Sequence, residues 1–147
     1  MNKNRDDNMT SNIVYRKLIP SDVEAYHQIR LDCLKKYAEY FGTLYEEELN
    51  SGSFKFDRII LENCATDFIM GAFMNQALIG ICGLIQERRQ KTKHIGELSG
   101  MYVMPEFSGR SIGSGLLKST IKTAFKNQDL EQIVLAVAAK NRIAQRL

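Results

Sequence analysis

The sequence has no long run of apolar residues. The longest, residues 77–85, holds nine residues even with its two glycines counted, whereas a membrane-spanning helix needs about 20. The first twelve residues are almost wholly polar and carry both signs of charge, so they lack the apolar centre of a secretory signal. We therefore expect a cytoplasmic protein with no membrane partner, and a flexible leader over residues 1–12.

A large excess of charge of one sign is also missing. Twenty Lys and Arg residues face seventeen Asp and Glu residues, and the net charge of +3 is too small to make nucleic-acid binding the default interpretation. One basic cluster falls between two apolar runs, and it is expected to be a solvated hairpin tip. It consists of Arg88, Arg89, Lys91 and Lys93, with His94 beside them.

Cysteine is scarce. The chain has three, Cys33, Cys64 and Cys82, and both their odd number and their wide spacing fit neither a disulfide framework nor a zinc site. All three sit among apolar residues, so we expect buried thiols that act as small hydrophobic side chains. No sequence feature supplies a base to any of them for nucleophilic catalysis, and no metal site is predicted.

The composition that remains is that of a globular protein. Hydrophobic residues make up 44% and charged residues 25% of the 147 positions, close to the average for such proteins. A chain of this length forms one ordinary α/β domain, which we place at residues 13–147.

Hydrophobic periodicity predicts the order of the elements. Period-two patterns predict strands over residues 13–19, 67–73, 78–85, 94–104 and 133–137, with a tight turn at Asn75 and Gln76. Helical patterns run from Ser21, capped with the help of Glu24, to about residue 37, then through residues 54–61 and 112–125, and a last one begins near Asn141. This order predicts an α+β domain of three layers with a mostly antiparallel sheet.

The segment with the most chemical information is residues 101–115, MYVMPEFSGRSIGSG, in which a strand leads through Pro105 and a glycine-rich turn into an amphipathic helix. Free backbone N–H groups and the helix dipole at such a turn favour an anion, and phosphate in particular. A glycine turn before a helix is also compatible with a simple turn. The spacing excludes two nucleotide loops, because Gly115 is followed by Leu116 rather than by lysine and serine, and because no further glycine completes a dinucleotide fingerprint.

Residues 102–114 of this segment resemble the coenzyme A binding motif of the GNAT superfamily, the acyl-CoA-dependent N-acetyltransferases, and the order of elements is similar too. Five residues match the family pattern, namely Val103, Pro105, Gly109, Ile112 and Gly113. Two depart from it: Ser108 stands where arginine or glutamine is usual, and Ser111 stands where the middle glycine is usual.

Two further stretches support the likeness. Residues 40–48, YFGTLYEEE, look like the aromatic and acidic stretch beside the acceptor site of many family members. Residues 141–147, NRIAQRL, look like the start of the last family motif, and the sequence ends one residue before the tyrosine of that motif would fall. The resemblance implies a three-layer GNAT-like α/β/α fold without its C-terminal strands. The strand edge left exposed would allow a homodimer.

The resemblance also implies the roles of particular residues. Glu97 would draw the proton from the amine, a bulge at Gly100 would splay the strand from its neighbour, and the Val103 N–H would hold the thioester carbonyl. Tyr45 and Glu46 would bind the acceptor. The acetyl-CoA contacts carried over from the family are Met101, Tyr102, Val103, Ser108, Gly109, Arg110, Ser111, Ile112, Gly113, Ser114 and Asn141.

The function expected on these grounds is N-acetyltransferase activity, with acetyl-CoA as the acyl donor and a primary amine of a small molecule or a protein as the acceptor. A base must first remove a proton from the amine, because an alkylammonium with a pKa of about 10.4 has no lone pair with which to attack the thioester. The alternative is a catalytically weak or inactive module of the same fold that binds acyl-CoA or mediates association.

Overall fold

The computed structural model describes residues 12–41, 47, 50, 54, 56–64 and 66–135, with the backbone alone for residues 37–41. Its elements are β1 (Ile13–Lys17), η1 (Pro20–Asp22), α2 (Val23–Phe41), α4 (Asp57–Glu62), β2 (Phe68–Met74), β3 (Ala77–Gln86), β4 (Ile95–Val103), η2 (Pro105–Phe107), α5 (Ile112–Ala124) and β5 (Gln132–Leu135). None of the helices within these ranges is long and apolar enough to cross a membrane.

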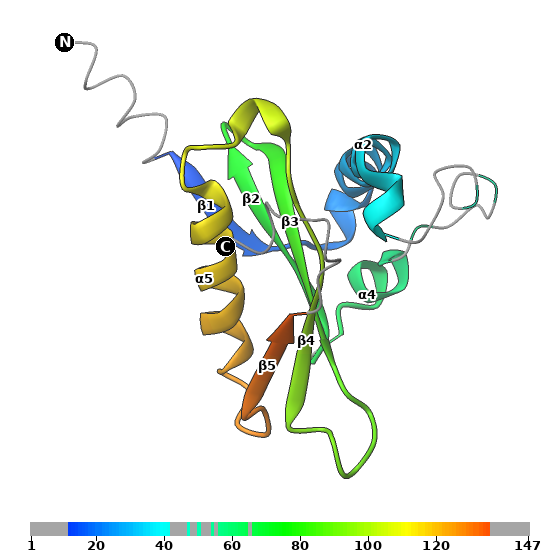
Figure 1. Ribbon diagram of the computed structural model, residues 1–147. Helices are drawn as coiled ribbons and strands as arrows, with labels where there is room; N and C mark the ends of the chain where they lie inside the picture. Colours follow the sequence, from blue (N-terminus) through cyan, green and yellow to red (C-terminus); the bar gives the residue numbers. More distant parts are fainter. Residues whose placement is uncertain are drawn as a thin grey trace.

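The strands form one sheet in the order β1-β2-β3-β4-β5. Neighbours from β1 to β4 are antiparallel, and β4 with β5 is parallel. Helix α5 covers one face of the sheet, and α2 and α4 lie on the other (Figure 1). The predicted three-layer α+β fold with a mostly antiparallel sheet is therefore confirmed. The tight turn at Asn75 and Gln76 is confirmed as well, because both residues have positive φ, 50° and 71°.

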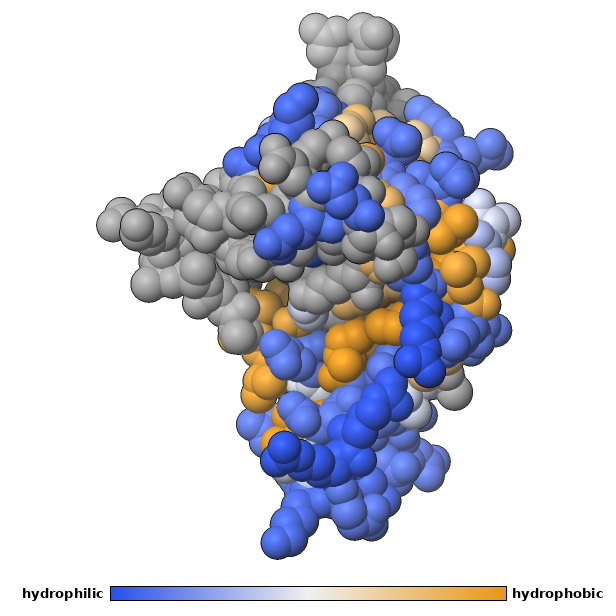
Figure 2. Space-filling view, turned by 90° about the vertical axis from the view of Figure 1, so that its right-hand side faces the viewer, coloured by the Kyte–Doolittle hydropathy of each residue, from blue (hydrophilic) through white to orange (hydrophobic). Residues whose placement is uncertain are grey.

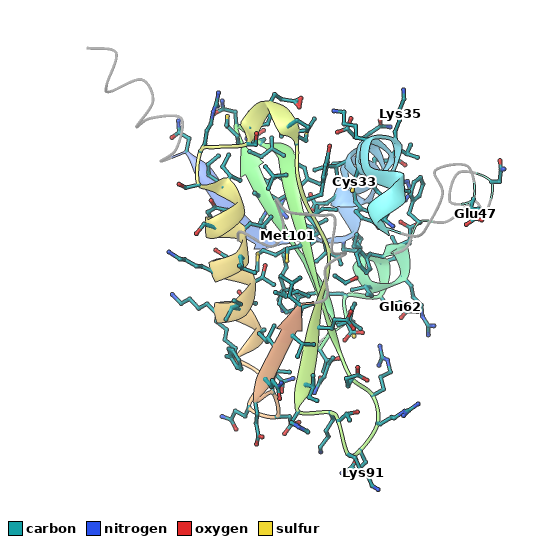
Figure 3. The ribbon with its side chains drawn as sticks, in the orientation of Figure 1. Cys33, Lys35, Glu47, Glu62, Lys91 and Met101 are labelled. Atoms are coloured by element: carbon teal, nitrogen blue, oxygen red, sulfur yellow. The ribbon has the colours of Figure 1, made fainter. Side chains whose placement is uncertain are left out.

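Alternation along the strands divides the core into two clusters. The cluster under α5 is formed by Phe68, Met70, Ala72, Ile79, Cys82, Leu84, Leu98, Ile112, Leu116, Ala124 and Leu130. The cluster under α2 and α4 is formed by Leu18, Tyr26, Ile29, Cys33, Phe56, Ile60, Ile69, Phe73, Ile81 and Tyr102. In Figure 3, Cys33 on α2 points toward the sheet and Lys35 on the same helix points away from it.

The expected capping box of Ser21 and Glu24 is wrong. A short 3-10 turn precedes α2, and its anchor is Asp22, whose carboxylate accepts the Ile19 N–H at 2.8 Å. Arg16 of β1 binds the same carboxylate through two nitrogens at 2.7 and 3.0 Å. The helical turn begins at Pro20, one residue before the predicted start at Ser21. The fixed φ of proline suits the first residue of a 3-10 turn.

Helix α5 ends one residue before the predicted boundary. The helical pattern extends to residue 125, but the helix ends at Ala124 and Phe125 is 45% exposed. Thr120 inside the helix is fully buried, and its hydroxyl donates to the Leu116 carbonyl at 2.8 Å. A local hydrogen bond of this kind lets a polar residue enter the core.

The basic segment between β3 and β4 is a solvated hairpin tip, as predicted. Residues 87–91 and 93 are exposed, and Lys91 lies at the far end of the hairpin (Figure 3). In Figure 2, which looks onto the α2 and α4 side, hydrophilic residues cover the lower part of the molecule, where Figure 1 places this hairpin. Arg88 is tied back, because its guanidinium contacts the buried Asp67 carboxylate at 2.6 Å.

The cysteine prediction holds for two of the three residues. Cys33 and Cys82 are fully buried, whereas Cys64 is only partly buried. Cys64 lies after α4, outside the helices and strands, and its thiol lies 3.6 Å from the Thr66 hydroxyl.

Candidate active site

Strand β4 contains a bulge at the predicted glycine. Ile81 of β3 pairs with Tyr102 and Gly83 pairs with Ser99, so Gly100 and Met101 together face a single β3 residue, Cys82. Gly100 has a φ of +67°, in the left-handed region that glycine tolerates best. The bulge predicted at Gly100 is therefore confirmed.

The bulge changes which side chains share a face. Before it, Leu98 points into the core under α5, so Glu97 points toward α2 and α4. After it, Tyr102 packs on the α2 and α4 side while Val103 packs under α5. In a regular strand Glu97 and Tyr102, five positions apart, would point to opposite faces. The extra residue brings both onto the same face.

Beyond the bulge, β4 turns two backbone amides away from β3. The Met104 N–H donates to the Ile79 carbonyl at 2.9 Å, and alternate residues of a strand direct their N–H groups to the same side. The Tyr102 N–H therefore also points toward β3, whereas the N–H groups of Met101 and Val103 point away from β3. Within the part of the chain that the structure describes, pairing of β4 with β5 ends at Leu98, and Figure 1 shows β5 beside only the first part of β4.

The glycine-rich turn ends in a helix N-terminus with free donors. The Gly115 N–H makes the helical bond to the Ser111 carbonyl at 3.0 Å, so the N–H groups of Ile112, Gly113 and Ser114 precede the regular ladder. Ser111 makes no side-chain capping bond to them, and the first turn of α5 has no acidic residue. These donors, together with the helix dipole, fit a phosphate or pyrophosphate group.

Gly109 and Ser111 give this turn its shape. Gly109 has a φ of +80°, and a Cβ placed there would meet nothing within 4 Å, so the approach to the turn is open. Ser111 has a φ of +63°, which costs a residue with a Cβ about 1–2 kcal/mol. The left-handed backbone at Ser111 is the physical reason why a glycine suits this position.

The other two side chains of the turn are exposed and make local contacts. The Ser108 hydroxyl donates to the Pro105 carbonyl at 2.8 Å, so its hydrogen is directed into the turn. The Arg110 guanidinium lies 5.6 Å from the centroid of the Phe107 ring. Arg110 is the cationic residue of the turn and precedes the start of α5 by two positions in the sequence.

Glu97 is half-buried and sits between Ile85 on β3 and Val134 on β5 in the pairing register. It lies on the same face as Tyr102 and before the open amides of Met101 and Val103. A carboxylate there could take a proton from a group bound on the α2 and α4 side.

Tyr102 makes a contact that the sequence did not indicate. Its hydroxyl donates to the Asp32 carboxylate of α2 at 2.5 Å, and Lys36 lies 3.1 Å from the same carboxylate. Burial acts to raise the pKa of Asp32, but the hydrogen bonds from Tyr102 and Lys36 outweigh it and hold that pKa below its usual range. No motif surrounds Asp32, and only the folded structure shows its contact with Tyr102.

The remaining predicted site residues are placed as follows. Met101, Tyr102, Val103 and the turn residues 108–114 are brought together at the end of β4 and the start of α5. Tyr45, Glu46 and Asn141 lie outside the described residues, as does the predicted helix beginning near Asn141. Glu47, next to the predicted acceptor residues, is exposed (Figure 3).

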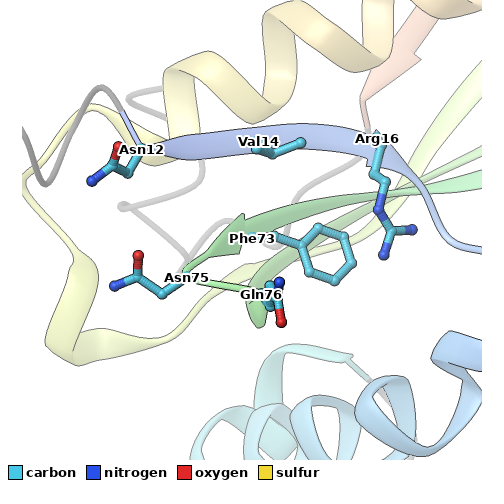
Figure 4. A pocket seen from close by; sticks show the side chains of 6 residues that line it. All are labelled: Asn12, Val14, Arg16, Phe73, Asn75 and Gln76. Carbon is cyan, nitrogen blue, oxygen red and sulfur yellow. The ribbon is translucent and has the colours of Figure 1, made fainter.

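A hollow of about 390 Å³ lies elsewhere, over β1 and the β2–β3 turn (Figure 4). Its lining is formed by Asn12, Val14, Arg16, Phe73, Asn75 and Gln76. The Arg16 guanidinium in this hollow already forms an ion pair with Asp22, and it lies 4.0 Å from the centroid of the Phe73 ring. Strand β3 separates it from β4, so it is not part of the site described above.

The described part of the chain thus combines a bulged strand, amides turned away from β3, and a glycine turn at a helix N-terminus. The sequence matches the Acetyltransferase (GNAT) family over residues 24–147. The chain therefore belongs to the GNAT acetyltransferase family, whose members depend on acyl-CoA.

Solved structures agree with this fold. A probable acetyltransferase from Staphylococcus epidermidis is similar with a TM-score of 0.72 and 21% identity, over 91% of this chain and 78% of that one. The PaiA N-acetyltransferase from Thermoplasma acidophilum, in complex with coenzyme A, has a TM-score of 0.70 and 25% identity over 91% and 84%. AAC(6')-Iy, in complex with the bisubstrate analogue CoA-S-monomethyl-acetylneamine, has a TM-score of 0.66 and 15% identity over 91% and 85%. A search of curated protein sequences found no match.

Proposed function

We propose that this chain transfers an acetyl group from acetyl-CoA to a primary amine of a small molecule or a protein, by direct attack of the amine on the thioester. The observation that carries the proposal is the part of β4 beyond the bulge, where the amides of Met101 and Val103 face away from β3 immediately before the glycine turn. The family and the coenzyme A complex of the PaiA relative support acetyl-CoA as the donor.

The start of α5 and the end of β4 would hold the donor through three groups of contacts. The free N–H groups of Ile112, Gly113 and Ser114 suit its pyrophosphate, with Arg110 as the nearby cation. The edge of β4 offers Met101 and Val103 to the amides of its pantetheine arm, as a neighbouring strand would. The Val103 N–H then lies in line to hold the thioester carbonyl oxygen as negative charge develops on it.

The chemical step needs a base and an acid. Glu97 takes one proton from the ammonium, directly or through water, so that the nitrogen can attack. As the N–C bond forms and the C–S bond breaks, the nitrogen loses a second proton, and the leaving thiolate takes up that proton directly or through water. Tyr102 is not suited to supply that proton, because its hydroxyl hydrogen is directed at Asp32.

The alternative is a module of the same fold that binds acyl-CoA without efficient turnover. Two features of the turn favour it, namely the strained backbone at Ser111 and the Ser108 hydroxyl that is engaged by Pro105. Both weaken the phosphate site relative to a turn with glycine and a longer cationic or amide side chain at these positions.

Calorimetric titration of the full chain with acetyl-CoA, free CoA and ATP separates these proposals. Micromolar binding of acetyl-CoA that ATP does not share, and that Gly113→Leu abolishes, supports the site. Lys118→Leu is the matched control, because it adds the same side chain at an exposed position of α5. Mass spectrometry with a polyamine, an aminoglycoside and a lysine-containing peptide then reports acetylated product. Binding without product favours the module, and no binding by folded protein overturns both proposals.

A further inference from the structure

Tyr102 is anchored at both of its ends. Its backbone faces β3 in the pairing with Ile81, and its hydroxyl donates to Asp32 of α2 at 2.5 Å. Its side chain is buried, with 6% exposure. Tyr102 therefore connects β4 to β3 through its backbone and to α2 through its side chain.

The neighbours of Tyr102 need such an anchor. Met101 and Val103 turn their amides away from β3, and the described pairing with β5 has already ended at Leu98. Gly100, directly before them, has the backbone freedom of a glycine in a bulge. Within the described residues, this segment is paired with β3 alone, and it directly follows the irregular backbone of the bulge.

Asp32 is suited to hold this segment. A hydrogen bond to an ionised carboxylate is stronger than one between neutral groups. Lys36, one turn along α2, also lies 3.1 Å from the Asp32 carboxylate. Lys36 is 41% exposed, so its ion pair contributes little by itself. The contact of Asp32 with Tyr102, in contrast, reaches the sheet.

We propose that Asp32 is a positioning residue for the proposed acetyl transfer, and that it acts through the Tyr102 hydroxyl to fix the Val103 amide against the donor carbonyl. The inference rests on the proposed function. Asp32 touches neither the donor nor the acceptor in this scheme. Its effect falls on the rate of the chemical step, because a displacement of about 1 Å in a reacting geometry can lower a rate by about 100-fold.

Four variants test the proposal. Asp32→Ala and Tyr102→Phe each remove the hydrogen bond, and the second keeps the buried ring. Asp32→Asn keeps an oxygen that can accept from Tyr102, so it is the conservative rescue. Lys36→Met is the matched control, because it removes the ion pair and leaves the contact between Asp32 and Tyr102. Circular dichroism confirms that each variant is folded, and if Asp32→Ala is not, Tyr102→Phe carries the same comparison.

The kinetic expectation is a fall in kcat with little change in KM. Asp32→Ala and Tyr102→Phe should each lower kcat by about 10- to 100-fold and change the KM for acetyl-CoA by less than about 3-fold. The double variant Asp32→Ala/Tyr102→Phe should be no slower than the slower single variant, because both remove one interaction. Asp32→Asn and Lys36→Met should stay near the parent rate. Additive losses, or equal losses in Asp32→Asn and Asp32→Ala, would overturn the proposal.

A second readout does not depend on activity. In ¹⁵N-labelled protein without ligand, Asp32→Ala and Tyr102→Phe should shift the amide resonances of Met101 and Val103, and Lys36→Met should leave them in place. Unchanged resonances in both hydrogen-bond variants would exclude the proposal. A parent protein without acetyl transfer would refute the proposed function, while these spectra would still decide whether Asp32 holds the Val103 amide.

Discussion

The ring of Phe56 fills the space that a side chain at Gly100 would need, with its nearest carbon 2.7 Å from the position of an ideal Cβ. Phe56 comes just before α4, and its N–H donates to the Tyr26 hydroxyl of α2 at 3.0 Å. The bulge of β4 is therefore shaped by close packing as well as by its own backbone.

Gly100→Ala should be more destabilising than the same change at another left-handed glycine. At Gly100 the new methyl group meets both a φ of +67° and the Phe56 ring, for a cost of about 2–4 kcal/mol. At Gly109 the φ is +80° but no atom lies within 4 Å, so Gly109→Ala should cost only about 1–2 kcal/mol. Urea unfolding of both variants measures the difference, and equal losses would mean that Phe56 moves aside freely.

Glu97→Gln should abolish proton removal and leave donor binding unchanged. Loss of a general base typically lowers the rate by about 100- to 10,000-fold, whereas the donor contacts are made by the β4 edge and the start of α5. Steady-state kinetics and calorimetry on the same samples test this. Glu131→Gln, an exposed glutamate just before β5, is the control, and a parent-like rate in Glu97→Gln would remove Glu97 from the mechanism.

Ser111→Gly should stabilise the turn and tighten donor binding. The substitution relieves the left-handed strain, and part of the gain is lost to the greater freedom of glycine in the unfolded chain, so we expect about 0.5–1 kcal/mol of added stability. The Kd for acetyl-CoA should fall several-fold, because the turn needs less rearrangement. Ser114→Gly, inside the first turn of α5, should instead lower the stability by about 0.5–1 kcal/mol, and a loss in Ser111→Gly as well would contradict this account.

Asp22→Asn should destabilise the protein at neutral pH and less at acid pH. The hydrogen bonds from Arg16 hold the pKa of Asp22 below its usual range, against the opposing effect of burial and with help from the Ile19 N–H. Because the folded-state pKa is lowered, this stability is present above the unfolded pKa and is lost as the pH falls through the folded value. The variant should lose about 1–2 kcal/mol at pH 7, and the difference should shrink below about pH 4. Thermal melts across this range check the sign.

Cys64 should be the first thiol to react with iodoacetamide. The Asp67 N–H is the main cause of its lowered pKa, and it acts with Thr66 against burial. Burial raises the pKa of Cys82 to about 11, and Cys33 is fully enclosed. Mass spectrometry should show one alkylated site in the native protein and three in urea, and Cys64→Ser should abolish native labelling. Early modification of Cys82 would show that the core under α5 opens easily.

The sequence by itself determined the order of elements, the hairpin turn at Asn75 and Gln76, the bulge at Gly100 and the glycine turn before α5. Each of these is local, because hydrophobic period, turn residues and glycine act within a few positions of the chain. The donor residues predicted from the likeness to the family motif are local in the same sense, since all but Asn141 are nearly contiguous between residues 101 and 114.

The tertiary structure alone decided the contacts between distant elements. Asp22 rather than Ser21 anchors the start of α2, because Arg16 reaches it from β1. Asp32 meets Tyr102 seventy positions later, and neither residue has a local pattern that announces the pair. Such contacts depend on how a helix packs across a sheet and on the one-residue change of register at the bulge. That packing is a property of the assembled core, and no window of the sequence contains it.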